Sequence, residues 1–184
     1  IVELTDISPH GRFTPEIESQ FIQCPDDVSE GWLYLDGAFG KPTEDIESVK
    51  ANKLEELRQA AAIAYVSGFY SNASGHSMYY DSEKDDQTLI AGVYARTMEP
   101  DWETKVRYPG ICEAGFAPIR ARAMKDTPNE QKEIKILNKE QLKILIDDLD
   151  SHLYSVKVTH WQLQGAVESA YQSSDIEGIK AISW

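Results

Sequence analysis

The amino-acid sequence predicts an α+β fold in which two long helices pack on short antiparallel β-hairpins, with an extended N-terminal arm. Residues 142–170 carry apolar side chains at alternating spacings of four and three, which is the period of a helix with one apolar face. A second helical stretch ends at a glycine, Gly68, and several short apolar runs are separated by turn-forming residues. With 184 residues, the chain is long enough to bury a core without disulfide bonds.

The first 42 residues are expected to form the extended arm and a hairpin connector. Residues 32–35 are apolar and aromatic, and Asp36-Gly37 follows them, which is a strong signal for a two-residue turn between strands. Thr43 is a plausible N-cap for the helix that comes next. We therefore divide the chain into an arm and connector (residues 1–42), an α+β domain (43–172) and a C-terminal tail (173–184).

The first long helix is predicted to run to Ser67 and to stop at Gly68, because glycine readily adopts the left-handed conformation of a C-cap. Its apolar stripe consists of Ile46, Val49, Leu54, Leu57, Ala61 and Ala64. Residues 69–70 and 78–80 then predict two short strands on either side of a turn at 72–75.

The middle of the chain predicts another helix and another hairpin. The helix begins within residues 81–88, and its buried side is expected to hold Leu89, Ile90, Val93 and Tyr94. Residues 116–124 and 133–137 are predicted to pair as strands. Ile119, Ala121 and Ala123 alternate along one of these strands, and Ile134 and Ile136 alternate along the other.

The long C-terminal helix has the strongest pattern in the chain. Asn138, with Gln141 three residues later, matches a capping box at its start. A heptad seam follows, which consists of Leu142, Ile146, Leu149, Leu153, Val156, His160, Leu163 and Val167. The seam has two interpretations: it packs on the first long helix inside one subunit, or it is a surface for self-association.

Composition and charge exclude several classes of function. The chain carries 31 acidic and 18 basic residues, a net charge of −13, so it would repel phosphate backbones and we expect no nucleic-acid partner. No apolar run is long enough for membrane insertion. The two cysteines, Cys24 and Cys112, form no Cys-x-x-Cys pair and are expected to be free thiols.

The sequence contains no recognisable catalytic motif. Asp81, Glu83 and Asp85 imitate the start of a calcium-binding loop, but Asp86 and Gly92 replace the glycine and glutamate that such a loop needs. We therefore predict no catalytic residue, no metal site and no cofactor.

Aromatic residues are the remaining indication of a binding surface. Tyr and Trp are enriched at protein interfaces because they bury a large area at a low entropic cost. The candidate aromatic contact surface consists of Tyr70, Tyr79, Tyr80, Trp102 and Tyr108. The alternative is that these side chains form the core of a small mixed sheet.

Two long motifs carry a resemblance to a known family. The first is the helix at residues 50–68 with the tyrosine-rich segment 69–81, and the second is the stretch 132–142 with Trp161-Gln162-Leu163 in the helix that follows. Together they resemble an uncharacterised domain family at the C-terminal end of bacteriophage tail proteins. Residues 23–42 are similar to the connector of many tail fibre-associated and fibre-assembly proteins.

This resemblance implies a non-enzymatic protein of a phage or prophage tail, located in the virion or in the host cytoplasm during assembly. Its implied partners are tail or tail fibre proteins, and the fibre context favours a homotrimer. A tail fibre assembly chaperone is the alternative, and a host-surface carbohydrate-binding module is a further one.

Overall fold

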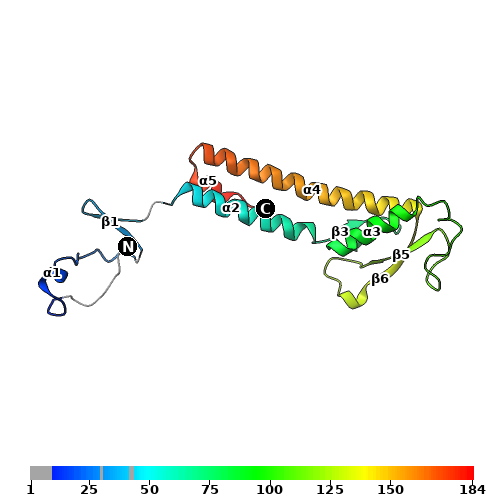
Figure 1. Ribbon diagram of the computed structural model, residues 1–184, viewed down its shortest axis with the longest axis horizontal. Helices are drawn as coiled ribbons and strands as arrows, with labels where there is room; N and C mark the ends of the chain where they lie inside the picture. The colour runs from blue at the N-terminus through cyan, green and yellow to red at the C-terminus, as the bar shows by residue number, and fades with distance from the viewer. Residues whose placement is uncertain (1–9, 30, 42–43) are drawn as a thin grey trace. The chain divides into compact units, whose positions relative to one another are not determined.

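The computed structural model describes residues 10–29, 31–41 and 44–184, and the chain divides into two units between Asp45 and Ile46 (Figure 1). Within the first unit, the described residues form α1 (Pro15–Glu18), β1 (Leu33–Leu35) and β2 (Ala38–Gly40). The expected N-cap Thr43 and the first part of the expected arm, residues 1–9, lie outside the described residues.

The predicted hairpin in the first unit is confirmed. β1 and β2 pair antiparallel, with Leu35 opposite Ala38, so that Asp36 and Gly37 form the two-residue turn. Both turn residues have positive φ angles, 52° and 83°, as a type I′ turn requires. Asparagine, aspartate and glycine tolerate that conformation, which is why this short sequence signal was sufficient.

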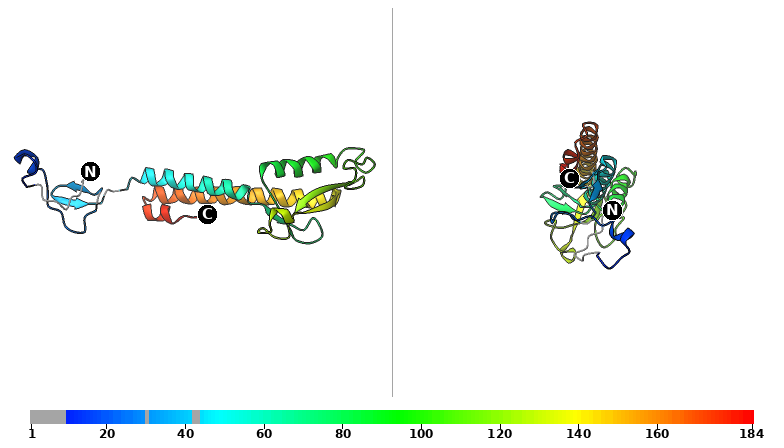
Figure 2. Two further views of the ribbon diagram at one scale, coloured as in Figure 1. Left: turned by 90° about the horizontal axis from the view of Figure 1, so that it is seen from below. Right: turned by 90° about the vertical axis from the view of Figure 1, so that its left-hand side faces the viewer.

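The second unit is a mixed α+β fold, as the sequence predicts. In chain order its elements are α2 (Ile46–Tyr65), β3 (Phe69–Ser71), β4 (Met78–Tyr80), α3 (Lys84–Arg96), β5 (Phe116–Ala121), the 3₁₀ turn η1 (Asn129–Gln131), β6 (Glu133–Asn138), α4 (Lys139–Gln172) and α5 (Ile176–Ala181). β3 pairs with β4, and β5 pairs with β6, both antiparallel. Figures 1 and 2 show α4 running beside α3 and the hairpins along its first half, and beside α2 and α5 along its second.

Two hydrophobic clusters lie along α4, and they differ greatly in size. The larger cluster surrounds the first half of the helix and contains Phe69, Met78, Tyr80, Ile90, Val93, Trp102, Ala117, Ile119, Leu137, Leu142, Leu145 and Leu149, among others. The smaller cluster has only Leu57, Val167 and Ile179 fully buried, with half-buried neighbours from α2 and α4 around them. The α2–α4 pair therefore has a thin core, and residues 173–184 contribute to it through Ile179 of α5.

The start of α4 confirms the predicted capping box. The Asn138 side chain accepts a hydrogen bond from the Gln141 backbone N–H at 2.9 Å, and the Gln141 side chain accepts one from the Asn138 N–H at 3.0 Å. These two bonds satisfy donors that the first helical turn leaves without partners, so the helix begins at a defined residue.

The end of α2 is fixed by Gly68 and Ser82. The helix ends at Tyr65, and Gly68 has the expected positive φ of 84°. The buried Ser82 hydroxyl donates to the Tyr65 carbonyl at 2.9 Å and accepts from the Gly68 N–H at 2.8 Å. One side chain thus satisfies a free carbonyl of the helix and a backbone N–H of the turn that follows it.

The prediction of the buried side of α3 was partly wrong. On α3, Ile90 and Val93 are buried and Tyr94 packs against the larger cluster, whereas Leu89 is exposed. In the β5–β6 hairpin, Ile119 and Ala121 of β5 and Leu137 of β6 are buried, whereas Ile134 and Ile136 of β6 are exposed. The register pairs Pro118 with Ile136, and side chains alternate along a strand, so both isoleucines lie on the outer face of the hairpin.

Candidate interaction site

The heptad seam of α4 lies largely inside the chain itself. Leu142, Leu149, Val156 and Val167 are buried, Ile146 and Leu153 pack against the larger cluster, and Leu163 packs against the smaller one. His160 is half-buried, with its ring 6.4 Å from that of Trp184. In one chain the seam thus serves as a core, first against the hairpins and α3 and then against α2.

Most of the predicted aromatic contact surface is buried. Tyr79, Tyr80 and Trp102 are at most 4% exposed, Tyr108 packs against the larger cluster, and only Tyr70 is exposed, at 54%. Tyr79 and Tyr80 are buried because both faces of β4 are covered, which leaves every residue of this strand inaccessible. Tyr80 belongs to the larger cluster, while the ring of Tyr79 contacts Tyr70 edge-on at 5.1 Å and lies 5.5 Å from the Arg122 guanidinium.

Asp81, the first residue of the segment that imitates a calcium-binding loop, belongs to an ion-pair cluster. Asp81 forms ion pairs with both Arg122 and Lys132, and these three side chains are largely buried. Burial by itself raises the pKa of Asp81, but hydrogen bonds from Lys132 and Arg122 outweigh it and hold that pKa below its usual value. The cluster joins the chain that leaves β4 to both ends of the loop that connects β5 with β6.

The exposed aromatic side chains of α4 form a different surface. Tyr154 is 65% exposed and Trp161 is 53% exposed. They lie two helical turns apart and therefore on one face of the helix. Between them, the Lys157 ammonium lies 4.8 Å from the centre of the Trp161 ring, which is a cation–π distance. We call Tyr154, Lys157 and Trp161 the aromatic stripe.

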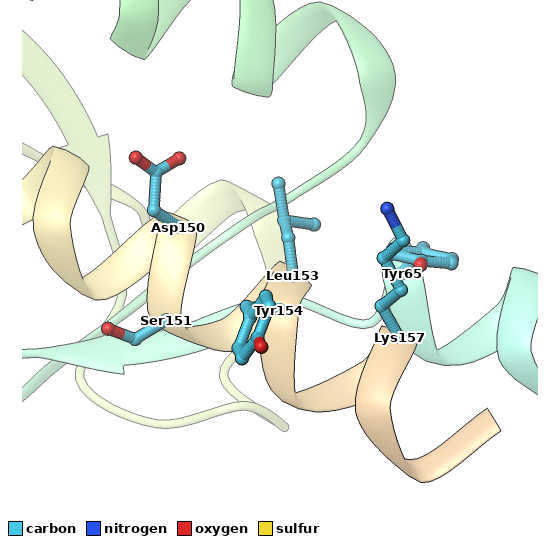
Figure 3. Close-up of a pocket in the computed structure, with 6 residues that line it drawn as sticks. All are labelled: Tyr65, Asp150, Ser151, Leu153, Tyr154 and Lys157. Atoms are coloured by element: carbon cyan, nitrogen blue, oxygen red, sulfur yellow. The ribbon is translucent and has the colours of Figure 1, made fainter. Parts of the chain in front are cut away.

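An open depression of about 660 Å³ adjoins one end of the aromatic stripe. Figure 3 shows its lining, which consists of Tyr65 at the end of α2 and Asp150, Ser151, Leu153, Tyr154 and Lys157 on α4. Asp150 is exposed and has no ion-pair partner among the described residues. The lining therefore combines apolar and aromatic surface with one free carboxylate, a composition suited to side chains of a partner protein.

The histidines of α4 do not add chemistry to this depression. His152 stacks on Phe69 at 6.0 Å, and its Nε2 is buried without a partner among the described residues, as is that of His160. Burial lowers the pKa of His152, and a hydrogen bond with the Ala64 backbone opposes part of that change. Within residues 10–29, 31–41 and 44–184, no group of three metal-ligating side chains comes together.

Sequence reasoning missed the aromatic stripe because it concentrated on the seam. A signal was present: Tyr154 and Trp161 have the spacing of one helix face, and both stand outside the seam positions. Large aromatic side chains that lie together outside a core stripe indicate a second contact surface.

Comparison with protein-family models, with curated proteins and with solved structures finds no match to this chain. Of the helices in the described part of the chain, none has both the length and the apolar character that crossing a membrane requires.

Proposed function

We propose that this protein is a non-enzymatic component of, or is closely associated with, the tail fibre or baseplate of a bacteriophage or prophage, and that it acts through protein–protein contacts. The motifs at residues 50–81 and 132–163 support the tail assignment by their resemblance to tail-associated domains. The observation that carries the contact function is the exposure of Tyr154 and Trp161 on a helix whose other apolar face is already covered.

Energetics support this role for the aromatic stripe. Burial of a large aromatic side chain contributes about 1.5–3 kcal/mol, so leaving Tyr154 and Trp161 in water forgoes a substantial stabilisation of the fold. Trp and Tyr are also the residue types that most often dominate the affinity of protein interfaces. A partner that covers both rings and reaches Asp150 would gain apolar burial and a charge-assisted contact.

The chemistry of the depression supports binding over catalysis. Its lining includes one serine, whose hydroxyl donates to the Asp147 backbone carbonyl at 2.8 Å, and no histidine. A nucleophilic serine needs a base within hydrogen-bond reach, and this serine is instead bonded to its own helix.

Two measurements test the proposal. The first is mass spectrometry of purified, intact particles of the phage or induced prophage that encodes the chain, and we expect the protein to be present. The second is co-purification with the neighbouring tail fibre proteins, using wild type and the double variant Tyr154→Ser/Trp161→Ser. We expect the double variant to fold and to lose the fibre partner.

Ile63→Ser is the matched control, because Ile63 is 69% exposed on α2 and stands outside the aromatic stripe. It should retain the partner. Absence from particles together with retention of every partner by the double variant would contradict the proposal.

A tail fibre assembly chaperone is the second candidate. The net charge of −13, combined with an exposed aromatic stripe, suits a factor that covers apolar fibre surfaces transiently and keeps them dispersed. Presence in assembly extracts and absence from mature particles would select this function. The exposed aromatic rings also fit a carbohydrate-binding module, which a glycan-binding screen without hits would eliminate.

A further inference from the structure

The β5–β6 hairpin exposes an apolar face that the rest of the described chain does not cover. Phe116 is 36% exposed, Ile136 39% and Ile134 57%. Pro118 lies opposite Ile136, and Arg120 lies opposite Ile134, in the antiparallel register. We call Phe116, Pro118, Arg120, Ile134 and Ile136 the outer sheet face.

The outer sheet face continues into the loop that precedes β5. Ile111 is 54% exposed, and together with Cys112, Glu113, Phe116 and Ile136 it lines a shallow depression of about 230 Å³. The apolar surface is thus continuous from Ile111 to Ile134, and it has a hollow at one end.

Such a face is unusual for a sheet that already has a buried side. In an antiparallel hairpin that packs one face on a core, the other face is commonly polar. The inner row here is buried as that rule expects, with Ala117, Ile119, Ala121 and Leu137 nearly inaccessible. Contiguous apolar surface on the second face marks a site of association.

Charges at the two ends of the outer sheet face are complementary to each other. Glu113 lies at the end with the hollow, and Arg120 lies at the other end, and neither forms an ion pair among the described residues. In a two-fold symmetric interface, every contact occurs twice: if residue i of the first copy touches residue j of the second, then residue j of the first copy touches residue i of the second. Two copies related by an axis near Pro118 and Ile136 would therefore bring Glu113 and Arg120 together twice.

We propose that the outer sheet face is a two-fold interface that joins two copies of this chain. The apolar centre supplies the burial, and the two Glu113–Arg120 pairs set the register and offset the repulsion between copies that each carry a net charge of −13. This inference uses no residue of the aromatic stripe, and it proposes a two-fold pair in place of the homotrimer that the fibre context favours.

Charge reversal on a symmetric interface makes the test sharp. Arg120→Glu places two acidic side chains against each other at both ends of the interface, and Glu113→Arg places two basic side chains there. In an equimolar mixture of the two variants, a mixed dimer has an acidic–basic pair at both ends. If the interface joins two copies of the chain, each variant alone should lose dimer formation, and the equimolar mixture should regain it.

Solution mass by light scattering or sedimentation across a concentration series provides the readout. Wild type should approach twice the 20.7 kDa of one chain. Each single variant should raise the dissociation constant by at least about tenfold, and the mixture should restore it. Lys84→Glu is the control for Arg120→Glu, since it makes the same change in charge at an exposed position of α3. It should dimerise as wild type does.

A second readout uses the native thiols. Cys112 lines the hollow of the interface, whereas Cys24 belongs to the other unit. Alkylation of Cys112 should slow relative to Cys24 as wild-type concentration rises, and this slowing should disappear in Arg120→Glu.

Several results would overturn the proposal. A wild type that stays monomeric at its highest soluble concentration would assign the face to a different partner. A mass of three chains would exclude two-fold pairing, and so would single variants that dimerise normally with Cys112 alkylation independent of concentration.

Discussion

Replacement of Gly68 by alanine tests the turn that follows α2, because two separate effects meet at this position. The first is conformational: Gly68 has a φ of +84°, and an L-residue in the left-handed region costs about 1–2 kcal/mol. The second is steric, since a Cβ placed on Gly68 would lie 2.5 Å from Cζ and 2.7 Å from Cε1 of Tyr79. Ordinary carbon contacts are about 3.5–4.0 Å.

The Tyr79 ring has little room to move away. It is 4% exposed, it contacts Tyr70 at 5.1 Å, and Arg122 lies 5.5 Å from its centre. Overpacking of this kind typically costs about 1–3 kcal/mol. We therefore expect Gly68→Ala to lower the free energy of unfolding by about 3 kcal/mol, a large fraction of the 5–15 kcal/mol of a typical domain.

Two other glycines separate the effects in a urea denaturation series followed by circular dichroism. Gly75 also has a positive φ, +91°, but a Cβ there would meet nothing within 4 Å, so Gly75→Ala should cost only the conformational part. Gly92 lies within α3 with open space around it, and Gly92→Ala should stabilise by about 0.5–1 kcal/mol. If Gly68→Ala costs no more than Gly75→Ala, the steric argument about Tyr79 is wrong.

Three further predictions concern polar groups of the second unit. Ser82→Ala should lower the free energy of unfolding by about 1–3 kcal/mol, since it leaves the Gly68 N–H without its buried partner and the Tyr65 carbonyl with only the 3.4 Å bond from Gln87. Ser77→Ala, at an exposed position, should change it by less than about 0.5 kcal/mol in the same denaturation assay. Burial lowers the pKa of His152, so the unfolded chain binds a proton at a higher pH than the folded chain does, and stability should fall as the pH drops below about 6.5. His152→Gln should flatten that slope in pH-dependent urea midpoints. The pKa of Asp81 is held below its usual value, so its ion pairs with Arg122 and Lys132 should stabilise the fold above about pH 4 and be lost as the pH falls further. Thermal melts of Asp81→Asn should therefore show a deficit at pH 7 that narrows toward pH 3, and a constant deficit would contradict this account.

Local signals in the sequence were sufficient wherever one or two residues determine the backbone. The Asp36-Gly37 turn, the left-handed Gly68 and the Asn138–Gln141 capping box all appear in the structure as expected. In each case a conformational preference or a short-range hydrogen bond operates within a few residues, so no knowledge of distant contacts was needed.

The buried side of each helix or strand was harder to predict than the helix or strand itself, because burial depends on which other segments cover a surface. Alternation alone correctly placed Ile134 and Ile136 on one side of β6, but it could not say that the inner side would be the one with Leu137. Likewise, composition alone could not show that β4 is covered on both sides, which buried Tyr79 and Tyr80, or that Tyr154 and Trp161 would be left in solvent.

The hydrogen bond between Glu47 and Tyr171 joins residues 124 positions apart, and this separation determines when α2 can acquire its partner during synthesis. On a ribosome, α2 is complete long before the second half of α4 has been translated. Until then Leu54 and Leu57 lack their partners from the second half of α4, while the larger cluster can assemble from segments that are nearer together in the chain. The order of translation therefore delays the docking of α2, the first long helix to be made, until the second half of α4 has been synthesised.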